Sequence, residues 1–155
     1  MIRQSLAGRC ILIVEDEPLV ALHVIDAVNR AGAIIRVTYS LREAAVLVEA
    51  DDLSAAILDY RVGDGDSSLL CQRLRERGVP FLIYSGYTEF SEACKDAPRL
   101  PKPTTDATLV AALEGLLSGP RETSVSTDRV GLAKEARRSQ PGAARGHRFP
   151  CSSSA

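Results

Sequence analysis

Five polar side chains stand at or just after the ends of short apolar runs and could act together on a phosphoryl group. Glu15 and Asp16 follow one run, Asp59 follows another, Ser85 closes a third, and Lys102 lies just past a fourth. Three carboxylates in one crevice repel one another, and a hard divalent cation such as Mg²⁺ removes that repulsion. Asp59 could then act as a nucleophile, while Lys102 and the Ser85 hydroxyl neutralise the oxygens of the incoming group. These residue types predict phosphoryl transfer onto Asp59.

This chemistry requires strands that end at a common edge. Short apolar runs bounded by turn residues predict strands that are buried on both faces, as in parallel sheets. These runs are residues 10–14, 55–59 and 81–85. Residues 34–39 are rich in β-branched side chains and predict another strand, and a fifth strand is expected around Leu100. In an open parallel sheet, ligands bind outside the carboxyl ends of the strands. The polar residues are therefore expected in one crevice.

Helix signals alternate with these strands. Pro18 begins a helix that stops near Gly32, and the Ser40–Glu43 capping box begins one that runs to about Ala50. Two more helices have their caps at Asp66 or Ser67 and at Thr105 or Asp106, and the first of these ends at Gly78. Five alternations predict an α/β, doubly wound fold with a five-stranded parallel sheet of flavodoxin-like order 2-1-3-4-5. The segment between the fourth and fifth strands is short, so the fourth helix is expected to be irregular, with at most one turn around residues 90–94.

Length and composition predict one globular domain. The chain has 155 residues, of which 45% are hydrophobic and 25% charged. Residues 1–117 carry 12 basic and 17 acidic side chains, a net charge of -5, whereas residues 118–155 carry 7 and 3, a net charge of +4. We predict a folded domain over residues 8–117 and a disordered, basic tail over residues 118–155, because the tail has few large apolar residues. The overall charge of -1 gives no general attraction to nucleic acid or membrane.

The cysteines give no metal-binding pattern. They stand singly at positions 10, 71, 94 and 151, with no C-x-x-C pair and no histidine at ligand spacing, so a zinc site is not expected. Scattered single cysteines favour a reducing, cytoplasmic compartment. The apolar run of residues 11–14 is too short for a signal peptide, and no run has the length of a membrane span.

Each candidate residue also has an ordinary structural explanation. Acidic residues 15–17 could favour the amino end of a helix through its dipole, and Asp59 could be a turn residue. Ser85 could simply end a strand, and Lys102 could be a solvated lysine beside prolines. Their joint occurrence, each at the carboxyl end of a different strand, favours function. Gly63 and Gly65 add little, since a tight turn explains them.

Four motifs together resemble the receiver domain of two-component response regulators, over roughly residues 8–117. The motifs are Ile13-Val14-Glu15-Asp16-Glu17-Pro18, Leu58-Asp59, Ser85-Gly86 and Leu100-Pro101-Lys102-Pro103. The resemblance implies that Asp59 accepts phosphate from a sensor histidine kinase. It also implies a cis bond between Lys102 and Pro103, a bond type nearly confined to proline.

The resemblance also implies a metal site and a switch. Mg²⁺ would be bound by Glu15, Asp16, Asp59 and the backbone carbonyl of Arg61. Ser85 would be the switch hydroxyl, and Lys102 would contact the phosphoryl group.

The fourth strand resembles more narrowly that of stand-alone receivers with the pattern P-F-x-F-A-T-G-Y. Residues 80–87 here are P-F-L-I-Y-S-G-Y, so Ser85 keeps the hydroxyl and Tyr84 adds bulk in place of alanine. The position three before Lys102, often an aromatic switch residue in receivers, is Arg99. We therefore hypothesise that Tyr87 takes the aromatic role and acts as a switch residue with Ser85.

The predicted function is that of a single-domain response regulator, a phosphoprotein switch and not a turnover enzyme. Its partners would be a sensor histidine kinase and a downstream protein, without direct DNA binding or membrane association, and a homodimer is allowed. The alternative is a receiver-fold adaptor that acts independently of phosphorylation. A phosphatase of the haloacid dehalogenase type would need an acid at position 61, where Arg61 stands. A flavin-binding role is weaker, because no Ser/Thr/Gly-rich phosphate loop follows the first strand.

Overall fold

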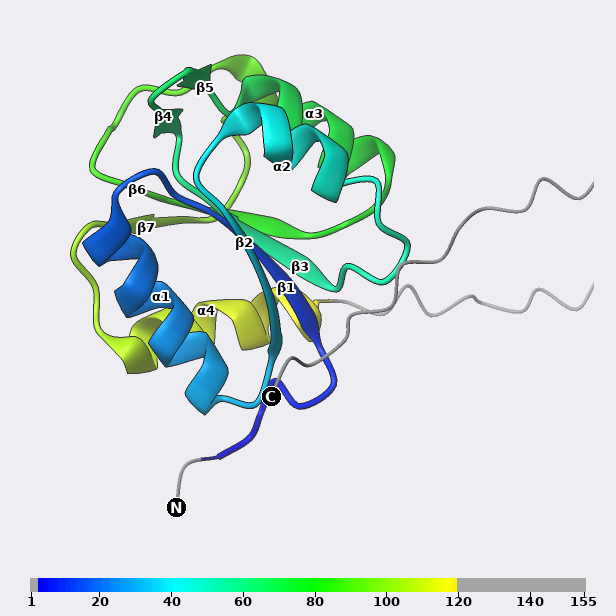
Figure 1. The fold of residues 1–155 in the computed structure, drawn as a ribbon, viewed down its shortest axis with the longest axis vertical. Coiled ribbons are helices and arrows are strands. Elements are labelled where there is room, and N and C mark those ends of the chain that lie inside the picture. The colour runs from blue at the N-terminus through cyan, green and yellow to red at the C-terminus, as the bar shows by residue number, and fades with distance from the viewer. Residues whose placement is uncertain (1–2, 120–155) are drawn as a thin grey trace, which may run out of the picture.

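The computed structural model describes residues 3–119, which form an α/β fold around one parallel sheet (Figure 1). The sheet strands are β1 (Cys10–Val14), β2 (Ile34–Thr38), β3 (Ala55–Leu58), β6 (Phe81–Ser85) and β7 (Arg99–Pro101). All four pairings between neighbours are parallel, and the order is β2-β1-β3-β6-β7. The predicted flavodoxin-like order is confirmed.

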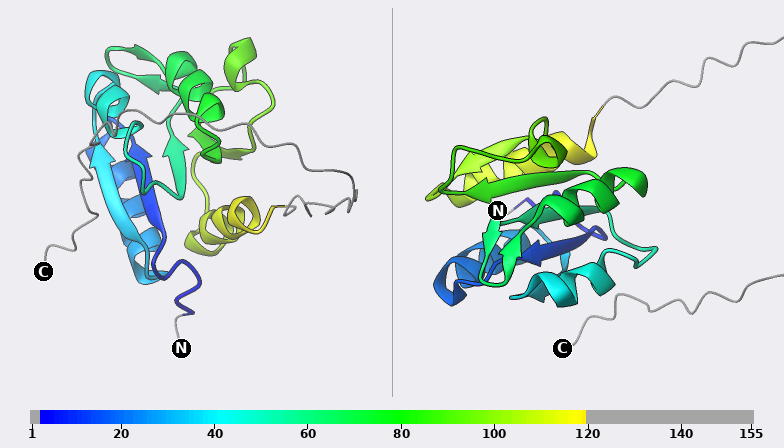
Figure 2. Two further views of the ribbon diagram at one scale, coloured as in Figure 1. Left: turned by 90° about the vertical axis from the view of Figure 1, so that its right-hand side faces the viewer. Right: turned by 90° about the horizontal axis from the view of Figure 1, so that it is seen from above.

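Helices cover both faces of the sheet (Figures 1 and 2). They are α1 (Pro18–Arg30) and α4 (Asp106–Leu117) on one face, and α2 (Leu41–Leu47) and α3 (Ser68–Glu76) on the other. Side chains alternate along each strand. In β1, Ile11 and Ile13 pack with the α1 and α4 side, whereas Leu12 and Val14 pack with the α2 and α3 side. This two-sided burial explains why the strand is a continuous apolar run.

Predicted caps are present at two helix starts. The Ser40 hydroxyl accepts from the Glu43 backbone N–H at 3.2 Å, and Thr105 accepts from Thr108 in the same way. The reciprocal half of the capping box does not form, because the Glu43 carboxylate accepts from the Thr38 hydroxyl at 2.7 Å instead. Helix α2 ends at Leu47, short of the predicted Ala50.

The start of α3 differs from the simple capping prediction. Ser67 occupies the cap position but gives no side-chain cap; Asp66 Oδ1 accepts from the Ser68 N–H at 2.9 Å. Hydrogen bonds from Ser68 hold the pKa of Asp66 below its usual value. Asp66 therefore caps the start of α3 from one residue before the cap position. The Ser67 hydroxyl is free to donate elsewhere in the fold.

A small hairpin follows Asp59, and the sequence pattern did not predict it. It consists of β4 (Arg61–Val62) and β5 (Gly65–Asp66), which pair antiparallel. Asp64 at its turn accepts from the Leu41 N–H at 3.2 Å, which ties the hairpin to the start of α2.

The segment between β6 and β7 contains only η1 (Glu92–Cys94), a single 3-10 turn. The expected absence of a full fourth helix in this segment agrees with the structure of residues 86–98. The Lys102–Pro103 bond is cis, as the resemblance implied.

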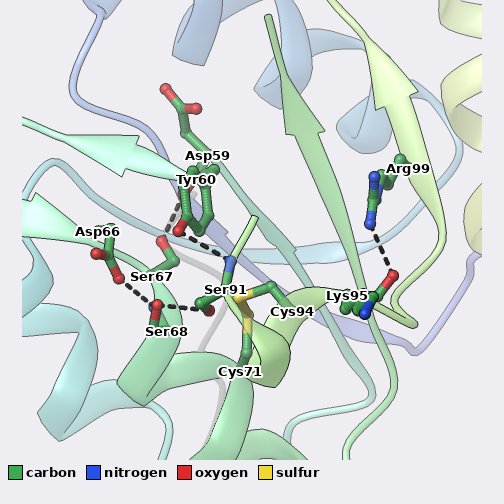
Figure 3. Close-up of a disulfide and its surroundings, with 10 residues drawn as sticks. All are labelled: Asp59, Tyr60, Asp66, Ser67, Ser68, Cys71, Ser91, Cys94, Lys95 and Arg99. Carbon is green, nitrogen blue, oxygen red and sulfur yellow. Dashed lines mark hydrogen bonds between the residues drawn. A yellow bond between two sulfur atoms is a disulfide. The ribbon is translucent and has the colours of Figure 1, made fainter. Parts of the chain in front are cut away.

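Two cysteines that were expected to stand singly are joined. Cys71 of α3 and Cys94 of η1 form a disulfide (Figure 3). They are 23 residues apart and meet because η1 packs against α3, a tertiary contact that cysteine spacing does not encode.

Two further expectations concern the chain outside the sheet. None of the helices in residues 3–119 has the length and apolar character that crossing a bilayer needs. The predicted disordered tail lies outside the described residues from position 120 onward.

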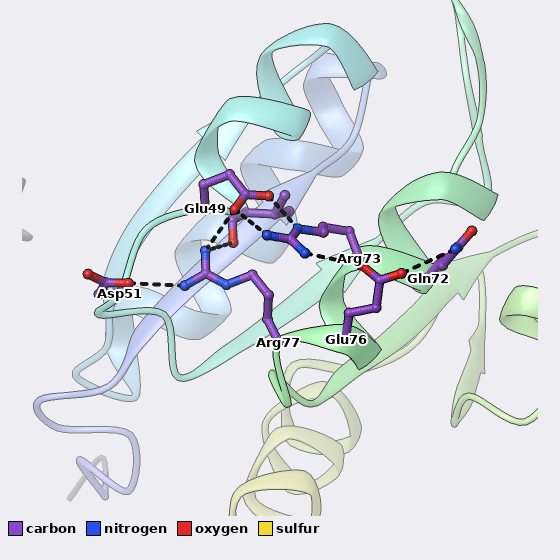
Figure 4. A network of polar contacts seen from close by, with 7 residues as sticks. Glu49, Asp51, Gln72, Arg73, Glu76 and Arg77 are labelled. Carbon is purple, nitrogen blue, oxygen red and sulfur yellow. Dashed lines mark hydrogen bonds and ion pairs between the residues drawn. The ribbon is translucent and has the colours of Figure 1, made fainter. Parts of the chain in front are cut away.

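Arginines of α3 connect it to the end of α2 (Figure 4). Arg73 donates to both Glu49 carboxylate oxygens, at 2.6 and 2.8 Å, and these bonds hold the pKa of Glu49 below its usual value. Arg77 donates to the Val48 carbonyl at 2.7 Å and also pairs with Glu49 and Asp51. The Arg77 side chain is 17% exposed, against 45% for Arg73. Arg77 is therefore the better placed of the two to stabilise the fold.

Replacing Arg77 with alanine should lower the free energy of unfolding by about 1–2 kcal/mol, because a charged hydrogen bond to a backbone carbonyl is lost. Arg73→Ala is the matched control and should cost less, since exposed ion pairs contribute little. Urea denaturation of both variants measures the difference. Equal losses would show that the two arginines contribute alike.

Candidate functional site

The five candidate side chains lie at one edge of the sheet. Glu15 and Asp16 follow β1, Asp59 follows β3, Ser85 ends β6, and Lys102 follows β7. Backbone bonds continue past the strands and fix these ends, since the Asp59 N–H donates to Val14 at 2.8 Å. Parallel pairing brings carboxyl ends together, so residues far apart in sequence meet here.

Lys102 joins two of the carboxylates. Its Nζ donates to Asp59 Oδ2 at 2.9 Å and to Glu15 Oε2 at 2.5 Å. The Nζ atom also lies 5.5 Å from the centre of the Tyr84 ring, a cation–π contact. The Tyr84 hydroxyl in turn accepts from the Thr104 N–H at 3.3 Å, close to Lys102 in the chain. The bulk that Tyr84 adds at this strand therefore packs against the lysine.

Burial makes it costly in free energy to keep the carboxylates of this cluster charged. Glu15 is 2% exposed and Asp59 is 7% exposed. Burial raises the pKa of Glu15 above its usual value, against the hydrogen bonds from Lys102 and from the Glu17 N–H. For Lys102, burial lowers the pKa, but the hydrogen bonds to Glu15 and Asp59 outweigh that effect and raise it. Lys102 is held protonated as the counter-charge of the two buried acids.

The carboxylates can hold a metal ion. One oxygen each from Glu15, Asp16 and Asp59 lie within 4.8 Å of one another. With all three ionised and Lys102 protonated, the cluster has a net charge of -2, which a divalent cation neutralises. An all-oxygen donor set suits a hard cation such as Mg²⁺. At Gly63 in the hairpin, an added Cβ would stand 3.3 Å from Asp16 Oδ2, so glycine there leaves room around that carboxylate.

Ser85 and Tyr87 lie on the β7 side of the site. Ser85 is buried, and its hydroxyl accepts from the Tyr87 N–H at 3.3 Å. Both line a pocket of about 270 Å³ together with Lys102, Phe90 and Arg99. The Tyr87 side chain is half exposed.

Two arginines near the site lie against aromatic rings. The Arg61 guanidinium lies 5.5 Å from the centre of the Tyr87 ring, so only the backbone of Arg61 remains as a candidate ligand. Arg99, at the usual aromatic switch position, has its guanidinium 4.1 Å from the Phe90 ring centre. Arg99 therefore supports the segment after β6 and does not enter the acidic cluster.

Two residues beside Asp59 have roles that the sequence did not indicate, Ser67 having been expected only as a possible helix cap. Ser67 is fully buried, and its hydroxyl donates to the Asp59 carbonyl oxygen. The Tyr60 hydroxyl accepts from the Ser91 N–H at 3.1 Å (Figure 3). The Tyr60 ring meets the Phe90 ring edge to face, with the ring centres 4.8 Å apart. A serine near a helix start looks like a cap, and a lone tyrosine carries no spacing signal. The local sequence pattern therefore predicts neither the Ser67 contact with Asp59 nor the Tyr60 contacts with Ser91 and Phe90.

The sequence matches no protein-family model and no curated protein. Solved structures are similar, however. SdrG from Sphingomonas melonis Fr1 is 32% identical, with a TM-score of 0.58, and the match covers 70% of this chain and 97% of that one. A protein described as a response regulator from Chloroflexus aurantiacus J-10-fl is 26% identical, with a TM-score of 0.65 and coverage of 72% and 99%.

A third similar structure holds a metal. It is the receiver domain of the sensor histidine kinase PA1611 from Pseudomonas aeruginosa PAO1, with a magnesium ion coordinated in its active-site cleft. It is 23% identical, with a TM-score of 0.65, and the match covers 73% of this chain and all of that one.

Replacing Lys102 with methionine should lower the free energy of unfolding without metal by roughly 3 kcal/mol, because two buried carboxylates lose their counter-charge. Added Mg²⁺ should recover more stability in this variant than in wild type, because the lysine no longer competes for the carboxylates. Chemical denaturation with and without Mg²⁺ measures both effects.

The matched control is Lys95→Met, which removes an exposed lysine that pairs with exposed Glu92. It should change neither quantity appreciably. A Lys102→Met protein as stable as wild type, and indifferent to Mg²⁺, would contradict the electrostatic account of the cluster.

Proposed function

Because the chain belongs to the response regulator receiver family, we propose that Asp59 accepts a phosphoryl group from a sensor histidine kinase and that the modified protein signals by contacting another protein. In this proposal the protein is a switch and not a turnover enzyme, since the side chain that reacts is itself changed.

One observation carries the proposal. The Lys102 ammonium bridges Asp59 and Glu15, and Asp16 completes an acidic cluster at the edge where four strands end. A lysine that only balanced charge would need no third carboxylate beside it. The surplus negative charge supports a site that also receives a cation and a phosphoryl group.

The chemistry of transfer follows from these groups. An Asp59 carboxylate oxygen attacks the phosphorus of a phosphohistidine. An O–P bond forms, the N–P bond breaks with its electron pair returning to the histidine nitrogen, and that nitrogen takes a proton from solvent. Lys102 is within hydrogen-bond distance of Asp59. Its ammonium group can therefore stabilise the negative charge on the oxygens of the incoming phosphoryl group. Burial of the Asp59 carboxylate restricts the number of waters around it.

The proposed metal is Mg²⁺. The carboxylates of Glu15, Asp16 and Asp59 and the backbone carbonyl of Arg61 would hold it, and their all-oxygen chemistry fits a hard cation. When bound, it supplies positive charge to the phosphoryl oxygens.

The proposed switch residues are Ser85 and Tyr87. Ser85 ends the strand next to β3, and its hydroxyl is bonded to the Tyr87 backbone. A phosphoryl group on Asp59 that drew the Ser85 hydroxyl toward itself would shift the backbone at Tyr87. The exposed Tyr87 ring beside the pocket would report that shift to a partner.

The output is proposed to be a protein contact in the cytoplasm. Residues 3–119 are filled by the receiver fold, and the net charge of residues 1–117 is negative, which does not favour DNA.

Asp59→Asn tests the proposed acceptor directly. Wild type treated with acetyl phosphate and Mg²⁺ should gain the mass of one phosphoryl group, and Asp59→Asn should gain none, because an amide is not a nucleophile here. Asp64→Asn is the matched control: it alters an exposed acid of the neighbouring hairpin and should still be labelled.

Labelling that persists in Asp59→Asn would place the acceptor elsewhere. No labelling of wild type by acetyl phosphate, together with no response to beryllofluoride, would favour the phosphorylation-independent adaptor.

Tyr87→Ala tests the switch. The variant should still be phosphorylated, but the coupling between Asp59 and the segment after Ser85 should weaken about tenfold, an energy of roughly 1.4 kcal/mol. Amide chemical shifts of residues 85–90 with and without beryllofluoride measure that coupling. Tyr87→Phe keeps the ring and should behave as wild type. Equal shift changes in Tyr87→Ala and wild type would refute the role.

A further inference from the structure

The Cys71–Cys94 disulfide links two segments of the candidate switch (Figure 3). Cys71 lies within α3, which follows the Asp59 hairpin, and Cys94 is the last residue of η1. Their Cα atoms are 5.6 Å apart, which is within the range of natural disulfides. Both side chains are fully buried. The covalent bond therefore fixes η1 against α3 at the centre of their contact.

Other contacts attach the same segment to the acceptor side of the fold. We call residues 86–98, which connect β6 to β7, the β6–β7 segment. Within it, Ser91 accepts from the Ser68 hydroxyl at 2.7 Å, and its N–H donates to the Tyr60 hydroxyl at 3.1 Å. Tyr60 directly follows Asp59 in the chain. The disulfide is thus the covalent member of a set of contacts that hold the β6–β7 segment beside Asp59.

The ends of the β6–β7 segment are both part of the site. It begins directly after Ser85, includes Tyr87, and leads into β7, which Lys102 follows. The proposed switch requires the backbone beyond Ser85 to move when Asp59 is modified. A crosslink at Cys94 limits that motion, because it removes conformations in which η1 leaves α3.

The compartment makes a permanent crosslink here unexpected. A receiver acting with a sensor kinase in the cytoplasm meets a reducing environment, where disulfides are usually transient and regulatory. The reduced form is compatible with the same fold, since buried thiols behave as small apolar groups. Cys71 and Cys94 both belong to the apolar cluster beneath α2 and α3. Losing the bond removes a restraint without leaving a charge or an unpaired polar group in the core.

We propose that Cys71 and Cys94 form a reversible thiol–disulfide pair that sets how freely the β6–β7 segment moves, and hence how strongly phosphorylation of Asp59 is transmitted. The disulfide form is the restrained, weakly responsive state, and the dithiol form is the responsive state. The redox pair stands by itself, whereas its effect on signalling rests on the proposed function.

The oxidant is a small-molecule disulfide of the glutathione class. One protein thiolate attacks it, forming a mixed disulfide and releasing one glutathione thiolate; the second protein thiolate then attacks the mixed disulfide, closing the Cys71–Cys94 bond and releasing the other. Two protein thiols are oxidised, one glutathione disulfide is reduced to two thiols, and the two protons go to those thiols. Glu92 begins the short 3-10 turn and Lys95 directly follows it, and both are exposed. We therefore expect the oxidant to reach the buried Cys94 sulfur when this one turn opens.

Redox trapping tests the pair without any phosphorylation. The full chain is equilibrated with graded ratios of glutathione and its disulfide, alkylated, digested and analysed by mass spectrometry. The linked Cys71–Cys94 peptide should appear and disappear reversibly across these ratios while far-ultraviolet circular dichroism stays unchanged. A peptide that never links, or that loses its link only in denaturant, would overturn the proposal.

Hydrogen exchange of the β6–β7 segment tests whether the disulfide restrains the motion of that segment. Reduction of wild type should raise its amide exchange about tenfold, since local opening is no longer restrained by the crosslink. Cys94→Ala should exchange alike under both redox conditions. Ser68→Ala, which removes the hydroxyl bond to Ser91 but keeps both sulfurs, should exchange faster than wild type in each form and retain the redox difference. Equal exchange in oxidised and reduced wild type would overturn the proposal.

Beryllofluoride with Mg²⁺ distinguishes the redox pair from its effect on signalling. The reduced protein and Cys94→Ala should show a larger change in exchange over the β6–β7 segment than the oxidised protein. Equal changes in both forms would overturn the link to signalling and leave the proposed function standing. No change in any form, with reversible trapping intact, would overturn the proposed function and the signalling link but not the redox pair.

Discussion

The bridge from the Lys102 ammonium to the carboxylates of Glu15 and Asp59 is the interaction on which the site depends. Two acids with almost no exposure cannot both remain ionised side by side without a counter-charge. The lysine supplies it, and it does so from the strand farthest along the chain, so the bridge exists only when β1, β3 and β7 are in their places in the sheet. The sheet must therefore be fully formed before the site can carry out its chemistry.

Much of this could be derived from sequence because strand and site signals coincide. A strand buried on both faces must be apolar along its whole length, so the first polar residue after it is placed at the edge of the sheet. Asp59 and Glu15 can therefore be placed at the edge of the sheet from sequence alone. The sequence pattern fails where tertiary contacts decide. The hairpin over residues 61–66 contains Gly65 and Asp66, residue types with low strand propensity, and it forms through its turn and its tie to Leu41.

The contacts of Arg99 and Tyr84 explain how this chain accommodates two residues that differ from the usual receiver pattern. Arg99 replaces an aromatic residue and lies over Phe90, while Tyr84 replaces a small residue and lies beside Lys102. The aromatic ring nearest the lysine therefore comes from β6, the neighbouring strand, and not from the position three before Lys102. Phe90 in turn meets Tyr60, the residue after Asp59. The segment after β6 is therefore connected to the acceptor by rings and hydroxyls, in place of a full helix.

If Asp59 accepts a phosphoryl group as proposed, Lys102 must move from the Asp59 carboxylate to the oxygens of that group. A crystal structure of the protein with beryllofluoride and Mg²⁺ tests this most directly. We expect beryllium on an Asp59 oxygen and the Lys102 ammonium within hydrogen-bond distance of a fluoride, away from the Asp59 oxygen that it contacts without the ligand. A fluoroberyllate bound at any other residue, or a lysine still bridging Glu15 and Asp59 beside an occupied site, would contradict the account.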